Sequence, residues 1–103
     1  MAPPGWLRTM QDDLGVLLGD NYTVAQAINT AGTIVGYSKN TSTGVQRAFV
    51  SYNDGSMVDL ITMVNSPAGW ALQAAEGINA SGLIVGYGLK NGTPRAFQLA
   101  PMF

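Results

Sequence analysis

A ten-residue segment occurs twice in this chain of 103 residues. The first copy, residues 28–37, reads Ile-Asn-Thr-Ala-Gly-Thr-Ile-Val-Gly-Tyr, and the second, residues 78–87, reads Ile-Asn-Ala-Ser-Gly-Leu-Ile-Val-Gly-Tyr. The triplet Arg-Ala-Phe follows each copy, at 47–49 and at 95–97. Repeated units bury one face against a neighbouring unit, so the repeat constrains the whole architecture. The sequence predicts a single domain, 1–103, built from two tandem units at about 13–58 and 59–99.

Each unit has the pattern of short strands separated by tight turns. Runs rich in Ile, Val, Phe and Tyr are interrupted by Asn, Gly, Asp or Ser, and no run keeps helical spacing for three turns. Asn29 followed by Gly32 predicts a type I turn that ends in a left-handed residue, and Asn79 with Gly82 repeats it. A further turn at 53–55 leads into a fourth strand at 56–62. We therefore expect an all-β protein of two four-stranded antiparallel meander units, each resembling a propeller blade.

The second unit lacks a fourth strand after its third strand at 94–100. Residues 9–14 resemble the fourth strand of the first unit, 56–62, because both segments contain a Met followed by Asp-Leu. We expect residues 9–14 to cover the open sheet edge of the second unit, within one chain or between neighbouring chains. A propeller needs about four blades or more. Two architectures therefore stay open, a homo-oligomer whose chains contribute two blades each, or an eight-stranded sandwich or barrel. The apolar content of 47% and the unfinished unit favour the homo-oligomer.

The composition excludes several classes of function. The chain has no His and no Cys, which removes the commonest general base, the thiolate nucleophile and the usual zinc ligands. We therefore predict no enzymatic activity, no cofactor and no metal site. Five basic residues are scattered rather than clustered, so nucleic acid is not an expected partner. No run of eighteen apolar residues and no signal-peptide core is present, so no membrane contact is expected and the localisation stays unknown.

Two arginines occupy equivalent positions in the two units. Arg47 and Arg95 each lie two residues before a Phe, and Asp59 and Asp13 would lie on the neighbouring fourth strands. An ion pair across neighbouring strands contributes about 0.2–1 kcal/mol, so a structural role is the first interpretation. Binding of an anion by the two arginines is the alternative.

Several aromatic residues form a second set of candidates. Tyr37 and Tyr87 are equivalent in the repeat, and Trp70 lies in a long connection, 62–73, that the first unit lacks in the same form. Aromatic faces beside Asn, Thr and Ser are typical of a sugar-binding cleft, and equally of a core or an interface. Loops on a rigid scaffold often carry binding residues. The candidate ligand-binding residues are Trp70, Tyr37, Tyr87, Arg47 and Arg95, for a carbohydrate or another small polar ligand.

The order of the repeated blocks resembles that of a known family. Ala-x-x-Ile-Asn-x-x-Gly-x-Ile-Val-Gly-Tyr, then Arg-Ala-Phe, then Met-x-Asp-Leu, is similar to the bacterial HAF repeats, described as probable extracellular repeats, and the likeness covers about 9–99. The family's namesake triplet is His-Ala-Phe, whereas this chain has Arg47 and Arg95 at the first position, so nothing that depends on the histidine carries over. The resemblance implies propeller-like β architecture and an extracellular location, and it implies no known reaction.

Two functions follow from these observations. The first is a non-enzymatic structural or interaction module that assembles with itself. The alternative is a binding module for a carbohydrate or small polar ligand that uses the aromatic and turn residues. The native mass of the particle and its response to sugars distinguish the two.

Overall fold

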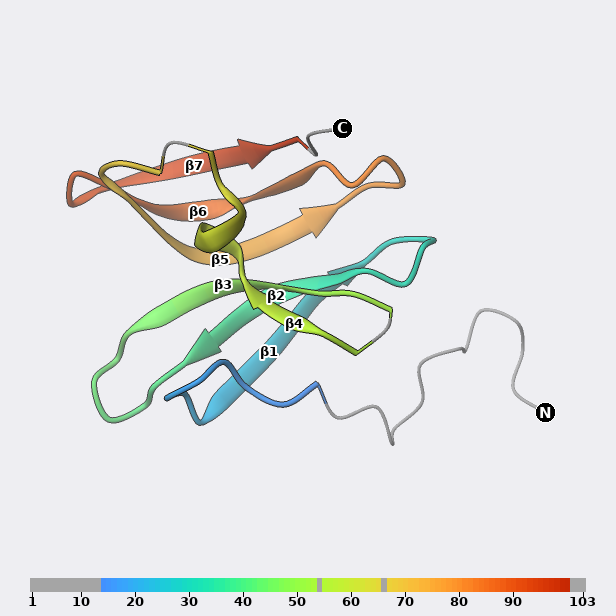
Figure 1. Ribbon diagram of the computed structural model, residues 1–103. Coiled ribbons are helices and arrows are strands. Elements are labelled where there is room, and N and C mark those ends of the chain that lie inside the picture. The colour runs from blue at the N-terminus through green and yellow to red at the C-terminus, as the bar shows by residue number, and fades with distance from the viewer. Residues whose placement is uncertain (1–13, 54, 66, 101–103) are drawn as a thin grey trace.

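The computed structural model describes residues 14–53, 55–65 and 67–100. These residues form two antiparallel sheets in which neighbouring strands are consecutive in the chain, with strand orders β1-β2-β3-β4 and β5-β6-β7 (Figure 1). The elements are β1 (Tyr22–Ile28), β2 (Ile34–Lys39), β3 (Gln46–Ser51), β4 (Met57–Asp59), the 3-10 helix η1 (Leu60–Met63), β5 (Trp70–Ile78), β6 (Ile84–Lys90) and β7 (Thr93–Leu99). The all-β prediction is confirmed.

The repeated Asn-x-x-Gly segments form the predicted turns with the same hydrogen bonds. The Asn29 Oδ1 atom accepts the backbone N–H groups of Ala31 and Thr33 at 3.1 and 3.0 Å, and the Gly32 N–H donates to the Asn29 carbonyl at 3.1 Å. Asn79 makes the equivalent bonds in the second unit. Gly32 and Gly82 have φ of 84° and 86°, a conformation that glycine adopts without steric cost. The turns therefore follow from local sequence alone.

The glycine of the repeated Ile-Val-Gly-Tyr, at Gly36 and Gly86, is required for a different reason, which is the close approach of a neighbouring strand. The register of β1 with β2 shifts beside Gly36, and the register of β5 with β6 shifts beside Gly86. A Cβ on Gly36 would overlap the carbonyl oxygen of Val24, and a Cβ on Gly86 would overlap that of Ala74. Glycine is required at both positions because the bulged backbone of the adjacent strand, β1 or β5, passes too close for a side chain.

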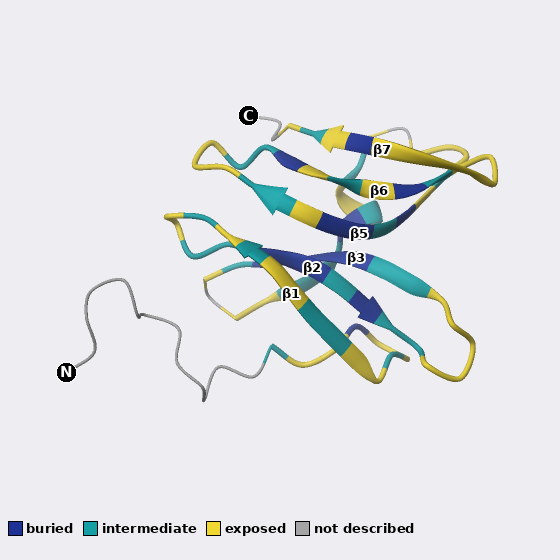
Figure 2. Ribbon diagram, turned by 180° about the vertical axis from the view of Figure 1, so that it is seen from behind, coloured by how far each residue is buried: buried dark blue, intermediate teal, exposed yellow. Residues whose placement is uncertain are grey.

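Strand β5 connects the two sheets by lying against β1, β2 and β3 of the first sheet (Figures 1 and 2). Side chains alternate between the faces of a strand, and the even-numbered residues of β3 face the second sheet. The shared core therefore combines one face of the first sheet with β5 and its neighbours. Its buried members are Val35, Ala48, Val50, Leu60, Leu72, Ala75, Ile84 and Phe97.

The opposite face of the first sheet is covered by the segment that precedes β1. Leu17 is buried against Ile34 and Phe49, and Leu14 and Met57 pack around them. Leu14 is the last residue of the segment predicted to complete the second sheet. It is not in a strand, and its contacts are with the first sheet. Residues 9–13 lie outside the described part of the chain, so the completion of the second sheet stays a prediction.

Two expectations need correction. The fourth strand of the first unit, expected at 56–62, covers only Met57–Asp59, and the chain continues as η1. The cause is local, because the Asp59 carboxylate accepts the Ile61 N–H at 3.3 Å and caps the helical turn, while Leu60 turns into the shared core. The barrel alternative is wrong for the described residues, because their two sheets remain open rather than closing on each other.

Candidate binding surfaces

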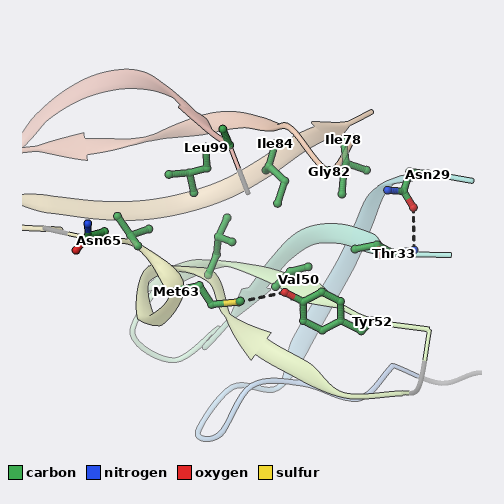
Figure 3. A pocket seen from close by; sticks show the side chains of 13 residues that line it. Asn29, Thr33, Val50, Tyr52, Met63, Asn65, Ile78, Gly82, Ile84 and Leu99 are labelled. Atoms are coloured by element: carbon green, nitrogen blue, oxygen red, sulfur yellow. Dashed lines mark hydrogen bonds between the residues drawn. The ribbon is translucent and has the colours of Figure 1, made fainter. Parts of the chain in front are cut away.

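A groove with a volume of about 500 Å³ lies where the two units meet (Figure 3). One wall is formed by η1 and the residues after it, and the other by β6, β7 and the turn between β5 and β6. The lining residues are Asn29, Thr33, Val50, Tyr52, Leu60, Met63, Val64, Asn65, Ile78, Gly82, Ile84, Leu99 and Ala100. Both repeats contribute to the groove, so neither unit could form it alone.

The lining of the groove is mainly aliphatic. Its polar groups are already engaged in part, because the Tyr52 hydroxyl donates to the Met63 Sδ at 3.3 Å and the Asn29 Oδ1 accepts the Thr33 N–H. No carboxylate, ammonium or guanidinium group is among the described lining residues. The groove can bind an apolar group by excluding water, and it offers no charged group to transfer a proton or to orient an anion.

Arg47 lies in an ion-pair network that holds the segment before β1. Its guanidinium is 3.1 Å from Asp59 Oδ2, as predicted, and also 3.1 Å from Asp20 Oδ2. It donates a further bond of 2.8 Å to the carbonyl of Leu18. The Asp20 side chain is only 5% exposed, so Arg47 neutralises a nearly buried charge. The structural interpretation of Arg47 therefore accounts for its contacts, and Asp20 is a partner that the sequence did not reveal.

Arg95, the equivalent residue of the second unit, has a different environment. It is exposed, and its guanidinium donates a bond of 3.1 Å to the carbonyl of the preceding Pro94. Its predicted partner, Asp13, lies outside the described residues. The two arginines thus share a position in the repeat without sharing a network.

The three aromatic candidates lie in different parts of the molecule. Trp70 begins β5 instead of lying in a loop, with its ring edge-on to Phe97 at 6.5 Å and Lys90 Nζ at 5.6 Å from the ring centroid. Tyr37 lies beside Tyr22 at 6.5 Å between ring centroids. The hydroxyl of Tyr87, which is 42% exposed, accepts a bond of 3.1 Å from Gln46 Nε2.

The structure does not gather the five predicted site residues. None of Trp70, Tyr37, Tyr87, Arg47 and Arg95 lines the groove. Within the described part of the chain, no hydrogen bond, ion pair or ring contact joins any two of the five. The groove itself was missed by sequence reasoning, because it arises from the way the two units pack. The segment Leu60 to Val64, apolar except for Thr62, is the one sequence signal that could have indicated it.

A second surface is the face of β6 and β7 that carries Val85, Tyr87 and Ala96, which we call the open face. Val85 and Tyr87 are among the exposed large hydrophobic residues, and Ala96 is exposed as well. Figure 2 shows exposed stretches along β6 and β7. Exposed aromatic and aliphatic side chains on one sheet face are typical of a surface that binds another protein.

Other kinds of site find no support in the described residues. They contain no group of three or more His, Cys, Asp or Glu side chains placed to hold a metal ion. None of their helices has the length and apolarity needed to cross a bilayer. Comparison of the chain with protein-family models, with curated proteins and with solved structures gives no match in any of the three.

Proposed function

We propose that this protein is a non-enzymatic structural or interaction module that associates with copies of itself through its repeated sheets. One observation carries the proposal. Val35 and Val85 occupy the same position of the repeat, yet Val35 is 0% exposed under the second unit whereas Val85 is 43% exposed. A surface that is buried between the two units of one chain is thus open on the second unit, and burial of apolar area is the main driving force for association.

The finer architecture belongs to the same proposal. The consecutive antiparallel order of the strands and the packing of each unit on the next support two propeller-blade-like meanders, similar to the HAF repeats. Two blades are fewer than the roughly four that close a ring. A homo-oligomer supplies the missing blades. Of the predicted segment 9–14, the residues before Leu14 are proposed to complete the second sheet, within one chain or between chains. The resemblance also favours an extracellular location.

The native mass tests this function. Light scattering coupled to size-exclusion chromatography, at micromolar concentration and moderate salt, is expected to give a multiple of the chain mass of 10.8 kDa. The mass should fall on dilution if the association is reversible. A particle of 10.8 kDa at every concentration would refute self-association.

A second candidate function rests on the groove. Its volume of about 500 Å³ lies within the range of small-molecule sites, and its lining of Val50, Leu60, Ile84 and Leu99 favours an apolar ligand over a sugar. Titration with an apolar fluorescent probe should saturate at one site per chain and be weakened by Ile84→Gln. Quenching of tryptophan fluorescence by a sugar, with no effect of the apolar probe, would favour the carbohydrate alternative instead.

A further inference from the structure

The contact between the two units is formed by two different surfaces. The first unit contributes a sheet face, with Val35 and Ala48 fully buried. The second unit contributes its edge strand β5, which lies across that face and buries Leu72 and Ala75. A contact between unlike surfaces of two equivalent units can be repeated indefinitely, whereas a contact between like surfaces ends with a pair.

The sheet-face half of this contact is unoccupied on the second unit. Val85 and Ala96 are the counterparts of Val35 and Ala48 in the repeat. Both are exposed, in contrast to the complete burial of their counterparts. The open face therefore presents the same Val and Ala that already receive an edge strand once within the chain. The match is incomplete at one place, where Gln98 stands in the position of Val50.

On the first unit the corresponding half is exposed along β1 only, because Ile34 and Phe49, the counterparts of Ile84 and Phe97, are covered by Leu17. Strand β1 is the counterpart of β5. The strand registers place Ala25 in the position of Ala75 and Thr23 in that of Leu72, because β5 has a second bulge between Leu72 and Ala74 that β1 lacks. Ala25 is exposed in β1, and so are Tyr22 and Ile28 at its two ends, whereas Thr23 is half-buried. Figure 2 shows exposed stretches along β1. Strand β1 and the open face are thus exposed counterparts of the two surfaces that meet inside the chain.

The repeated turns form a polar contact between the units, which also joins unlike groups of the two units. The Asn29 Nδ2 group of the first unit donates to the carbonyl oxygen of Asn79 in the second, at 3.1 Å. The Nδ2 group of Asn79 is exposed and has no hydrogen-bond partner among the described residues. A third unit placed as the second is placed on the first would present its own Asn carbonyl to this donor.

We propose that copies of this chain associate head to tail, with β1 of one copy lying across the open face, Val85, Tyr87 and Ala96, of the next. This interface rests on the self-association proposed above and specifies its surfaces. The Asn79 Nδ2 group of one copy donates to the Asn29 carbonyl of the neighbour, which repeats the bond inside the chain. Association of this kind gives a closed ring or a filament, according to the rotation between successive units.

Three single variants test the interface. Val85→Glu places a charge on the open face, and Ala25→Glu places one on β1. Both side chains are exposed in one copy, so folding is expected to persist, as checked by the β-sheet circular dichroism spectrum. Val45→Glu is the matched control, because Val45 is 56% exposed, lies in the connection before β3 and belongs neither to β1 nor to the open face. Val85→Gln replaces Val85→Glu if the charged variant does not fold.

Each interface variant is expected to weaken association by at least about ten-fold, because an unpaired charge would be buried on docking. Val45→Glu should keep the wild-type mass. A mixture of Val85→Glu and Ala25→Glu chains should form particles of two chains, since each variant retains the half that the other lacks. Wild-type mass in either interface variant, equal loss in the control, or no two-chain particle in the mixture would overturn this interface. A wild-type protein that stays monomeric would refute the self-association itself.

Discussion

Replacing Gly36 with Ala is expected to destabilise the protein by about 2 kcal/mol. The added Cβ would overlap the Val24 carbonyl oxygen and approach the Cα of Ala25 to 3.0 Å. Both atoms belong to the backbone of β1, so the neighbouring strand has to move. Overpacking that forces such movement typically costs about 1–3 kcal/mol, and the smaller entropy of an unfolded chain with Ala in place of Gly offsets about 0.4–1 kcal/mol. Because the obstacle is a backbone atom, we take the upper part of the range of about 1–3 kcal/mol, which leaves about 2 kcal/mol after the entropy offset.

Gly77→Ala is the matched control for this experiment. A Cβ on Gly77 would contact only the terminal Cγ2 of Val85, at 3.3 Å, and Val85 can turn because its side chain is exposed. The change should therefore alter stability by less than about 0.5 kcal/mol.

Urea denaturation of the two variants, followed by circular dichroism, measures the difference. The protein concentration must be equal and low, because the proposed self-association would contribute to the apparent stability. For a domain of this size each kcal/mol corresponds to roughly 4–8 °C in Tm, so Gly36→Ala should melt about 8–16 °C below wild type. Equal denaturation midpoints for Gly36→Ala and Gly77→Ala would refute the steric explanation of the repeated glycine.

Two further predictions concern residues that the repeat places in equivalent positions. Arg47→Met should destabilise the fold by about 2 kcal/mol, because the nearly buried carboxylate of Asp20 would lose its cation. Arg95→Met should change stability by less than about 0.5 kcal/mol, because Arg95 is exposed. Thermal melts of both variants check this, and equal effects would contradict it. Asn29→Asp keeps the acceptor oxygen of its turn but removes the donor to the Asn79 carbonyl, so a loss of about 0.5–1.5 kcal/mol is expected in urea. Asn79→Asp should instead leave the unfolding of the single chain nearly unchanged and weaken self-association in light scattering.

The parts of the fold that depend on neighbours in sequence were predictable. Asn29 and Gly32 determine their turn with their own side chain and backbone, and the second copy repeats it at Asn79 and Gly82. The pairing of Arg47 with Asp59 followed from strand order, because consecutive strands are adjacent in the sheet. These features require information from only a few residues or from one neighbouring strand.

Features that depend on distant packing were not predictable. Asp20 reaches Arg47 because residues 14–20 fold back over the first sheet, and no repeated pattern marks that contact. Trp70 was expected in the long connection 62–73 that the first unit lacks in the same form, yet it pairs with Lys90 as the first residue of β5. The groove arises between η1 and the second sheet, so its residues share no sequence motif.

The small cluster of Leu17, Ile34 and Phe49 has a consequence for how the chain reaches its native state. All of its members, with Leu14 and Met57, come from residues 14–57, the first unit and the segment before it. The second sheet differs in this respect. Those of its described buried residues that belong to a hydrophobic cluster all belong to the cluster that it shares with the first sheet. During synthesis residues 14–57 can therefore collapse on their own before the second unit leaves the ribosome. They then offer a preformed template on which β5 nucleates the rest.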